Sequence, residues 1–199
     1  MDLVLMPFGM DYPIVIGKIN KKGSFNVNIS LGDIENVPVE SREMFTGDLY
    51  FNLHFSCDNS DEFGIGNDEP AVRIDYIRMF IKDQWTGTAF LVSDENLLPW
   101  LEDKYYKNAI LGSFYEVVYV GQDMVVNTTC TSEKYVSDEL TVKAVYDYDL
   151  NLVKGFNWIE YVIEEVYITG SEELADFPLK VKVQSPSDPS KIRWIGKYY

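Results

Sequence analysis

Hydrophobic and polar residues alternate along most of this chain. Residues 25–31 place apolar side chains at every second position, and the same period of two recurs in residues 49–57, 140–148 and 179–184. Because successive side chains of a β-strand point to opposite faces, each run predicts a strand with one buried and one wet face. This pattern is typical of antiparallel sheets that carry a core on one side only.

Short glycine-containing turns separate several of these runs. Glycine adopts the left-handed backbone that a tight hairpin requires, so we predict three hairpins. Their turns are residues 20–23, between 14–19 and 24–31; residues 121–123, between 113–120 and 124–131; and residues 153–155, between 146–152 and 156–168.

Other segments are less regular. In residues 72–82 the apolar positions change face near Tyr76 and Ile77, which indicates either a β-bulge or burial of both faces. Residues 158–168 also fit a helical stripe, but their β-branched and aromatic side chains favour a strand. A short helix is expected to begin at Pro99. The expected loops are residues 33–46, 58–70, 132–138, 170–178 and 185–190.

These elements predict an all-β fold, either an antiparallel β-sandwich or a jelly-roll-like double sheet, with one or two short helices. The chain has 199 residues, which at roughly 150 residues per domain allows one large domain or two small ones. We expect a single sandwich domain over residues 1–199. The alternative is a break within residues 84–112, where the strand signals pause.

Charge excludes several classes of function. The chain has 17 basic and 32 acidic residues, a formal net charge of −15. Such a surface repels nucleic acid and anionic membrane faces, and its longest basic run is Lys21-Lys22. No apolar run approaches the roughly 20 residues of a membrane-spanning helix, and residues 1–7 lack the pattern of a signal peptide. We therefore expect no nucleic-acid partner and no transmembrane segment.

The two cysteines and the single histidine do not form a recognisable catalytic motif in the sequence. Cys57 and Cys130 either pair or remain as two buried thiols. His54 falls on the polar face of the expected strand 49–57, so we predict an exposed sheet residue. A catalytic role would require a serine or cysteine nucleophile nearby, and the sequence has no G-x-S-x-G motif. We predict no catalytic residue.

The most acidic stretch is residues 58–69, a glycine-jointed loop rich in oxygen ligands. Calcium prefers six to eight oxygen ligands, so Asp58, Asp61 and Asp68 are the predicted metal ligands here. The loop does not follow the EF-hand order, because Phe63 stands where that motif has glycine. The alternative is a solvated acidic loop, and no other cofactor is expected.

Aromatic and acidic residues suggest two further sites. Sugar-binding sandwiches stack exposed rings on pyranoses, and Trp85, in a turn-like segment, is the ring expected to be exposed and to bind ligand. Trp158 and Trp194 lie in strands and are expected in the core. A hydrolase would need a pair of carboxylates. Glu116 and Asp75 interrupt apolar strands, which a salt bridge to an arginine such as Arg73 or Arg78 also explains.

Parts of the chain resemble one group of proteins. Residues 14–27 (IVIGKINKKGSFNV), 148–158 (YDLNLVKGFNW) and 192–199 (IRWIGKYY) resemble the mature region of uncharacterised exported lipoproteins of Bacteroidetes-type bacteria. The resemblance implies a leader and a lipidated cysteine upstream of residue 1, and hence a cell-envelope location. It brings no known activity and no functional residue.

Together these patterns predict a non-enzymatic binding or structural module of the cell envelope, with glycan or partner-protein recognition through its loops. Two alternatives remain open. One is a carbohydrate-active hydrolase that uses two loop carboxylates, and the other is an intracellular β protein of unknown role.

Overall fold

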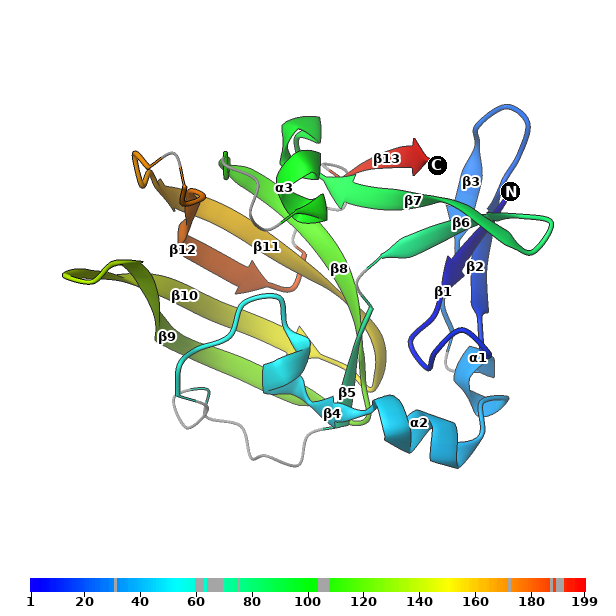
Figure 1. The fold of residues 1–199 in the computed structure, drawn as a ribbon. Helices are drawn as coiled ribbons and strands as arrows, with labels where there is room; N and C mark the ends of the chain where they lie inside the picture. The colour runs from blue at the N-terminus through cyan, green and yellow to red at the C-terminus, as the bar shows by residue number, and fades with distance from the viewer. Residues whose placement is uncertain are drawn as a thin grey trace.

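The computed structural model describes residues 1–30, 32–59, 63, 70–74, 76–103, 108–171, 173–186, 188 and 192–199, with only the backbone of residues 33 and 35. The fold is all-β, as predicted, with short helices beside the strands (Figure 1). The strands are β1 Asp2–Leu5, β2 Ile14–Ile19, β3 Phe25–Val27, β4 Gly47–Asp48, β5 Pro70–Ile74, β6 Ile77–Ile81, β7 Gln84–Val92, β8 Gly112–Val120, β9 Met124–Ser137, β10 Leu140–Leu152, β11 Gly155–Tyr167, β12 Phe177–Gln184 and β13 Arg193–Tyr198. The helices are α1 Gly32–Glu35, α2 Val39–Phe45, α3 Leu98–Glu102 and the 3-10 turns η1 Leu49–Asn52 and η3 Glu95–Leu97.

All of these strands join one hydrogen-bonded network. Its main path runs β3-β2-β1-β6-β7-β8-β11-β12-β10-β9, while β13 pairs with β7, β5 pairs with β8, and β4 pairs with β5. Among the described strands, β10 and β12 form the one parallel pair. Strands β8 to β12 curve into a cup, and β1, β2, β3, β6 and β7 form a smaller group beside it (Figure 1).

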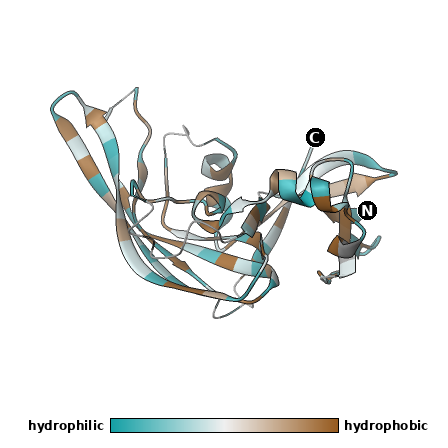
Figure 2. Ribbon diagram, turned by 90° about the horizontal axis from the view of Figure 1, so that it is seen from below, coloured by the Kyte–Doolittle hydropathy of each residue, from teal (hydrophilic) through white to brown (hydrophobic). Residues whose placement is uncertain are grey.

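Strand β8 is buried on both faces and lies between two hydrophobic cores. Phe114, Val118 and Val120 point into the larger core, inside the cup. Tyr115 and Val117 point into the smaller core, against β1, β2, β6 and β7. This double burial explains why the sequence of β8 is almost continuously apolar. Along the strands at the rim of the cup, by contrast, hydrophobic and hydrophilic bands alternate (Figure 2).

Only one of the three predicted hairpins is correct. Residues 20–23 do join the paired strands β2 and β3. Strands β8 and β9, however, have different partners, and β10 and β11 are separated by β12, so the other two predictions are wrong. A glycine turn permits the chain to reverse direction, but it does not specify which strand becomes the neighbour.

Four other local predictions need correction. Residues 72–82 form two strands, β5 and β6, with different partners, so no bulge within a single strand is needed. Residues 132–137, expected as a loop, continue β9, and residues 33–46 contain α1 and α2. Residues 49–57, expected as a strand, form η1 and then an irregular segment, because its apolar side chains fill the cup instead of extending a sheet. The expected short helix is present as α3, with Pro99 in its first turn.

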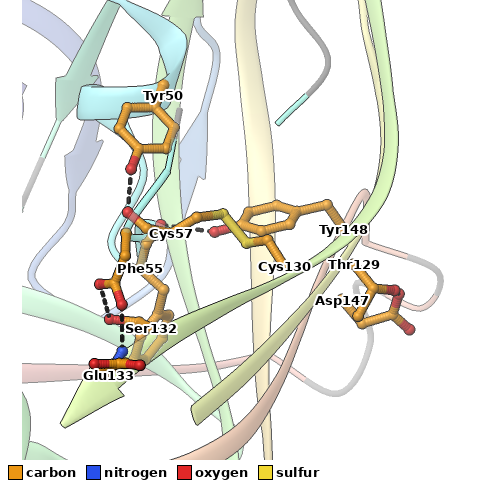
Figure 3. Close-up of a disulfide and its surroundings, with 10 residues drawn as sticks. Tyr50, Phe55, Cys57, Thr129, Cys130, Ser132, Glu133, Asp147 and Tyr148 are labelled. Carbon is orange, nitrogen blue, oxygen red and sulfur yellow. Dashed lines mark hydrogen bonds between the residues drawn. A yellow bond between two sulfur atoms is a disulfide. The ribbon is translucent and has the colours of Figure 1, made fainter. Parts of the chain in front are cut away.

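We refer to residues 53–59 as the strap. It crosses the concave face of the cup, where tyrosine side chains supply hydrogen bonds to its irregular backbone (Figure 3). The Tyr148 hydroxyl donates to the carbonyl of Phe55 at 2.8 Å, and the Tyr50 hydroxyl donates to the carbonyl of Cys57. Burial raises the pKa of Tyr148 well above its usual value, so this hydroxyl keeps its proton at neutral pH.

The strap is also tied covalently to the sheet. Cys57 forms a disulfide with Cys130 of β9, with Cα atoms 5.8 Å apart (Figure 3). The alternative of two buried free thiols is therefore wrong. The bond links positions 73 residues apart in the sequence and fixes the strap across the larger core.

We predict that replacing both cysteines with alanine lowers the free energy of unfolding by about 2–4 kcal/mol, because the cross-link restricts the unfolded chain. Urea unfolding followed by tryptophan fluorescence measures the loss. Wild-type protein unfolded in reductant is the matched control and should show a similar loss. An unchanged urea midpoint in both samples would contradict the role assigned to the disulfide.

Candidate functional site

A groove of about 410 Å³ lies on the face of β1, β2 and β6 opposite the smaller core. Strand alternation places it there: Leu3 and Leu5 of β1 enter the smaller core, while Asp2 and Val4 line the groove. The same alternation brings side chains from β2, β6 and β7 to this face. The lining residues are Asp2, Val4, Met6, Met10, Pro13, Val15, Arg78, Phe80, Asp83 and Trp85.

Trp85 stands at one side of this groove with 53% of its surface exposed, which confirms that this ring is accessible. Its indole Nε1 donates a 2.7 Å hydrogen bond to the carbonyl of Gly87. The Arg78 guanidinium lies 5.4 Å from the ring centroid, and the Tyr199 ring contacts the indole at a centroid distance of 5.6 Å in a T-shaped arrangement. These contacts hold the indole in one orientation.

The groove combines an apolar floor with charged groups at its rim. Val4, Met6 and Phe80 supply apolar surface, and Asp83 and Arg78 supply charge. Asp83 and its neighbour Lys82 turn the chain from β6 into β7 with positive φ angles of 61° and 50°. Non-glycine residues adopt this backbone at some cost, and such positions are found in tight turns and at binding sites. The composition is that of a small-ligand site: mostly apolar, with a few polar groups that fix orientation.

A second cluster is buried inside the cup and centres on His54. The prediction of an exposed sheet residue is wrong: the His54 side chain is 8% exposed and packs among aromatic rings. Its Nδ1 lies 2.9 Å from Oε1 of Glu116, and Nη2 of Arg73 lies 3.1 Å from the same oxygen. The sequence could not place His54 here, because residues 49–57 follow the period of a strand that does not form.

Nδ1 of His54 has two polar neighbours that require opposite roles of it. The Glu116 carboxylate has only acceptors, so it pairs with a hydrogen on Nδ1. Arg73 Nη2, 2.9 Å from the same nitrogen, has only donors, so it pairs with an Nδ1 that accepts. The backbone N–H of His54 donates to the Tyr161 hydroxyl at 3.1 Å, which fixes the main chain as well.

Burial alone would raise the pKa of Glu116, but the adjacent His54 and Arg73 outweigh that effect and hold the pKa below its usual value. Glu116 is therefore ionised at neutral pH. The salt bridge between Glu116 and Arg73 confirms the prediction that an arginine pairs with this carboxylate. Arg78, the other arginine considered, lies over the Trp85 ring. Asp75, considered with Glu116 as a carboxylate pair, lies outside the described residues.

The predicted calcium ligands are only partly placed. Asp61 and Asp68 lie outside the described residues. The Asp58 carboxylate accepts hydrogen bonds from the Ser132 hydroxyl and the Glu133 backbone N–H, and the Asp58 N–H donates to the Thr131 carbonyl. Asp58 thus covers the outer edge of β9, a device that protects a sheet edge. Among the described residues, no group of three or more His, Cys, Asp or Glu side chains is placed to hold a metal ion. Calcium binding stays a prediction.

Comparison with protein-family models, curated proteins and solved structures finds no match for this chain. Within the described ranges, no helix is both long enough and apolar enough to cross a bilayer.

Sequence reasoning identified Trp85 but missed the residues around it. Asp2 reaches the same groove as the indole only because β1 pairs with β6, and Arg78 reaches the ring because β6 pairs with β7. Alternation could have placed Asp2 and Arg78 on the wet faces of their strands. Nothing in the sequence shows that β1 lies beside β6, whereas Asp83 is only two residues from Trp85 along the chain.

We predict that Glu116→Gln lowers the free energy of unfolding by about 3–5 kcal/mol at neutral pH, because it leaves the Arg73 charge without its buried partner. Since the folded pKa of Glu116 is depressed, its contribution is complete above the usual value of 4.5 and is lost as the pH falls through the folded pKa. The variant should therefore lose less stability than wild type between neutral and acid pH. Urea unfolding at a series of pH values measures this, with the exposed Glu139→Gln as a control that should follow wild type.

Proposed function

We propose that this chain is a non-enzymatic binding module of the cell envelope that recognises a glycan at the Trp85 groove. The observation that carries the proposal is the oriented, half-exposed indole of Trp85 beside an apolar floor and a charged rim.

The chemistry of the groove matches that of a sugar ring. A pyranose has an apolar face of C–H groups, which stacks on an aromatic plane, and a periphery of hydroxyls that need donors and acceptors. Asp2 and Asp83 supply acceptors, and Arg78 supplies donors in a fixed planar fork. Met6 and Met10 add flexible apolar contacts that adapt to the shape of a ligand.

The same geometry favours binding over hydrolysis. Glycoside hydrolysis needs two carboxyl groups that flank the scissile bond, one of them protonated. Asp2 already forms an ion pair with the Lys18 ammonium, at 3.6 Å. We therefore assign Asp2 and Asp83 to hydrogen bonding with ligand hydroxyls.

The disulfide supports an envelope location. Disulfides persist in oxidising compartments outside the cytosol, and Cys57 and Cys130 are paired. The proposal includes the lipid anchor upstream of residue 1 that the resemblance to exported lipoproteins implies. A native reading frame that encodes a leader and a lipidated cysteine upstream supports this location. A frame that begins at Met1 without a leader would favour the intracellular alternative.

We expect neutral oligosaccharides from a panel of cello-, xylo- and manno-oligosaccharides to change the tryptophan fluorescence, and Trp85→Ala to weaken binding by at least about tenfold, because the stacking surface is lost. Isothermal titration calorimetry measures the affinity. Tyr135→Ala removes an exposed ring from β9, which does not line the groove, and should bind like wild type.

Three outcomes would contradict the proposal. If Trp85→Ala binds oligosaccharide with unchanged affinity, the groove is not the recognition site. If the protein releases reducing sugar, it is a hydrolase and not a binding module. If no oligosaccharide binds while a protein partner is retained through Trp85, the groove recognises protein instead.

A further inference from the structure

A second groove, of about 390 Å³, opens at the mouth of the cup above the buried cluster. Its floor consists of ring systems from the strap, α3 and β10: His54, Phe55, Trp100 and Tyr146. Strands β9 and β12 complete it. The remaining lining residues are Glu133, Lys134, Tyr135, Phe177 and Pro178.

The imidazole of His54 brings a polar atom to this floor. Its Nδ1 is in contact with Glu116, which leaves Nε2 on the other side of the ring. Within the described part of the chain Nε2 makes no hydrogen bond, although the side chain is only 8% exposed and lines the groove. In a neutral imidazole whose Nδ1 carries the hydrogen, Nε2 is an acceptor. A ligand that covers this acceptor removes it from water, so a ligand that donates a hydrogen bond to it binds more tightly than one that cannot.

The position of His54 is fixed before any ligand arrives. Glu116 holds its ring, the Tyr161 hydroxyl holds its backbone N–H, and the Phe114 ring packs against it at a centroid distance of 4.9 Å. The disulfide at Cys57 anchors the same strap three residues further on. Such preorganisation reduces the entropy that binding would otherwise cost.

We propose that this groove binds a neutral aromatic ring that carries one hydroxyl group, a phenol-type ligand, whose hydroxyl donates to Nε2 of His54. The volume falls within the usual range for small-ligand sites, roughly 300–1,000 Å³. The rim charges of Glu133 and Lys134 are opposite, which favours a ligand without net charge. The flat rings of Phe55 and Trp100, stacked 13° from parallel, offer apolar surface to an aromatic ring.

A sugar fits this groove poorly. Each hydroxyl that is buried without a partner costs free energy, and the side chains of the floor offer few polar atoms: those of the His54 imidazole, the Trp100 indole N–H and the Tyr146 hydroxyl. The Trp85 groove, with its several charged groups, has the opposite character. The two proposals therefore rest on different residues and different ligand chemistry.

The single histidine of the chain makes the test direct. In protein labelled with 15N-histidine, two-bond correlation spectra should show Nδ1 protonated and Nε2 unprotonated near neutral pH. Adding millimolar phenol should shift the Nε2 resonance in a saturable way. Anisole has the same ring but no hydroxyl hydrogen. It should therefore bind more weakly than phenol, by at least about tenfold in affinity. Methyl glucoside should leave the resonance unchanged.

Variants separate this site from the glycan site. Trp85→Ala should retain phenol binding in full, so failure of one proposal does not decide the other. His54→Phe keeps an aromatic ring without the nitrogen and should bind phenol and anisole equally, as measured by competition with a fluorescent naphthol. A proton on Nε2, an equal response of wild type to phenol and anisole, or no response to phenol would each overturn the proposal.

Discussion

The structure depends on the burial of β8 from both sides. One strand supplies the wall of the cup and the base on which the N-terminal strands pack, so each alternate side chain enters a different core. A strand in this position must be apolar on both faces, and any polar residue on it needs a partner inside the protein. Glu116 is the ionised residue that β8 places in the larger core, and Arg73 and His54 are the partners that allow it to remain there.

The interior of the cup must also be filled. A sheet curved this strongly leaves an interior that its own side chains do not occupy, and the strap fills it. Irregular backbone inside a core has no ladder to satisfy its N–H and C=O groups, so side chains must supply the hydrogen bonds. Tyr148, Tyr161 and Tyr50 perform this task, since each combines a large apolar ring with a polar tip. The aromatic content of the chain thus has a structural use before any ligand is considered.

The sequence predicted what local physics determines and failed where distant segments meet. Alternation identified β3, β10 and β12, the β-branched and aromatic side chains identified β11, and the proline in the first turn identified α3, because these signals reside in neighbouring residues. The same alternation misassigned the strap, since Phe55 and Cys57 are apolar for their contacts inside the cup and not for a place in a sheet. Trp85 was identified from its turn-like surroundings. Its groove and the cluster around His54 depend on strand order, which no local pattern encodes.

The position of β12 has a consequence for the order in which the sheet is completed. Strands β10 and β11 are consecutive in the chain, yet each pairs with β12, which is synthesised after both. Neither strand can complete its native pairing until β12 has been synthesised. A direct hairpin between β10 and β11 would have the shorter sequence separation, and pairings of long sequence separation are slow to form. The native topology therefore requires β12 to take the place between two strands that are consecutive in the chain.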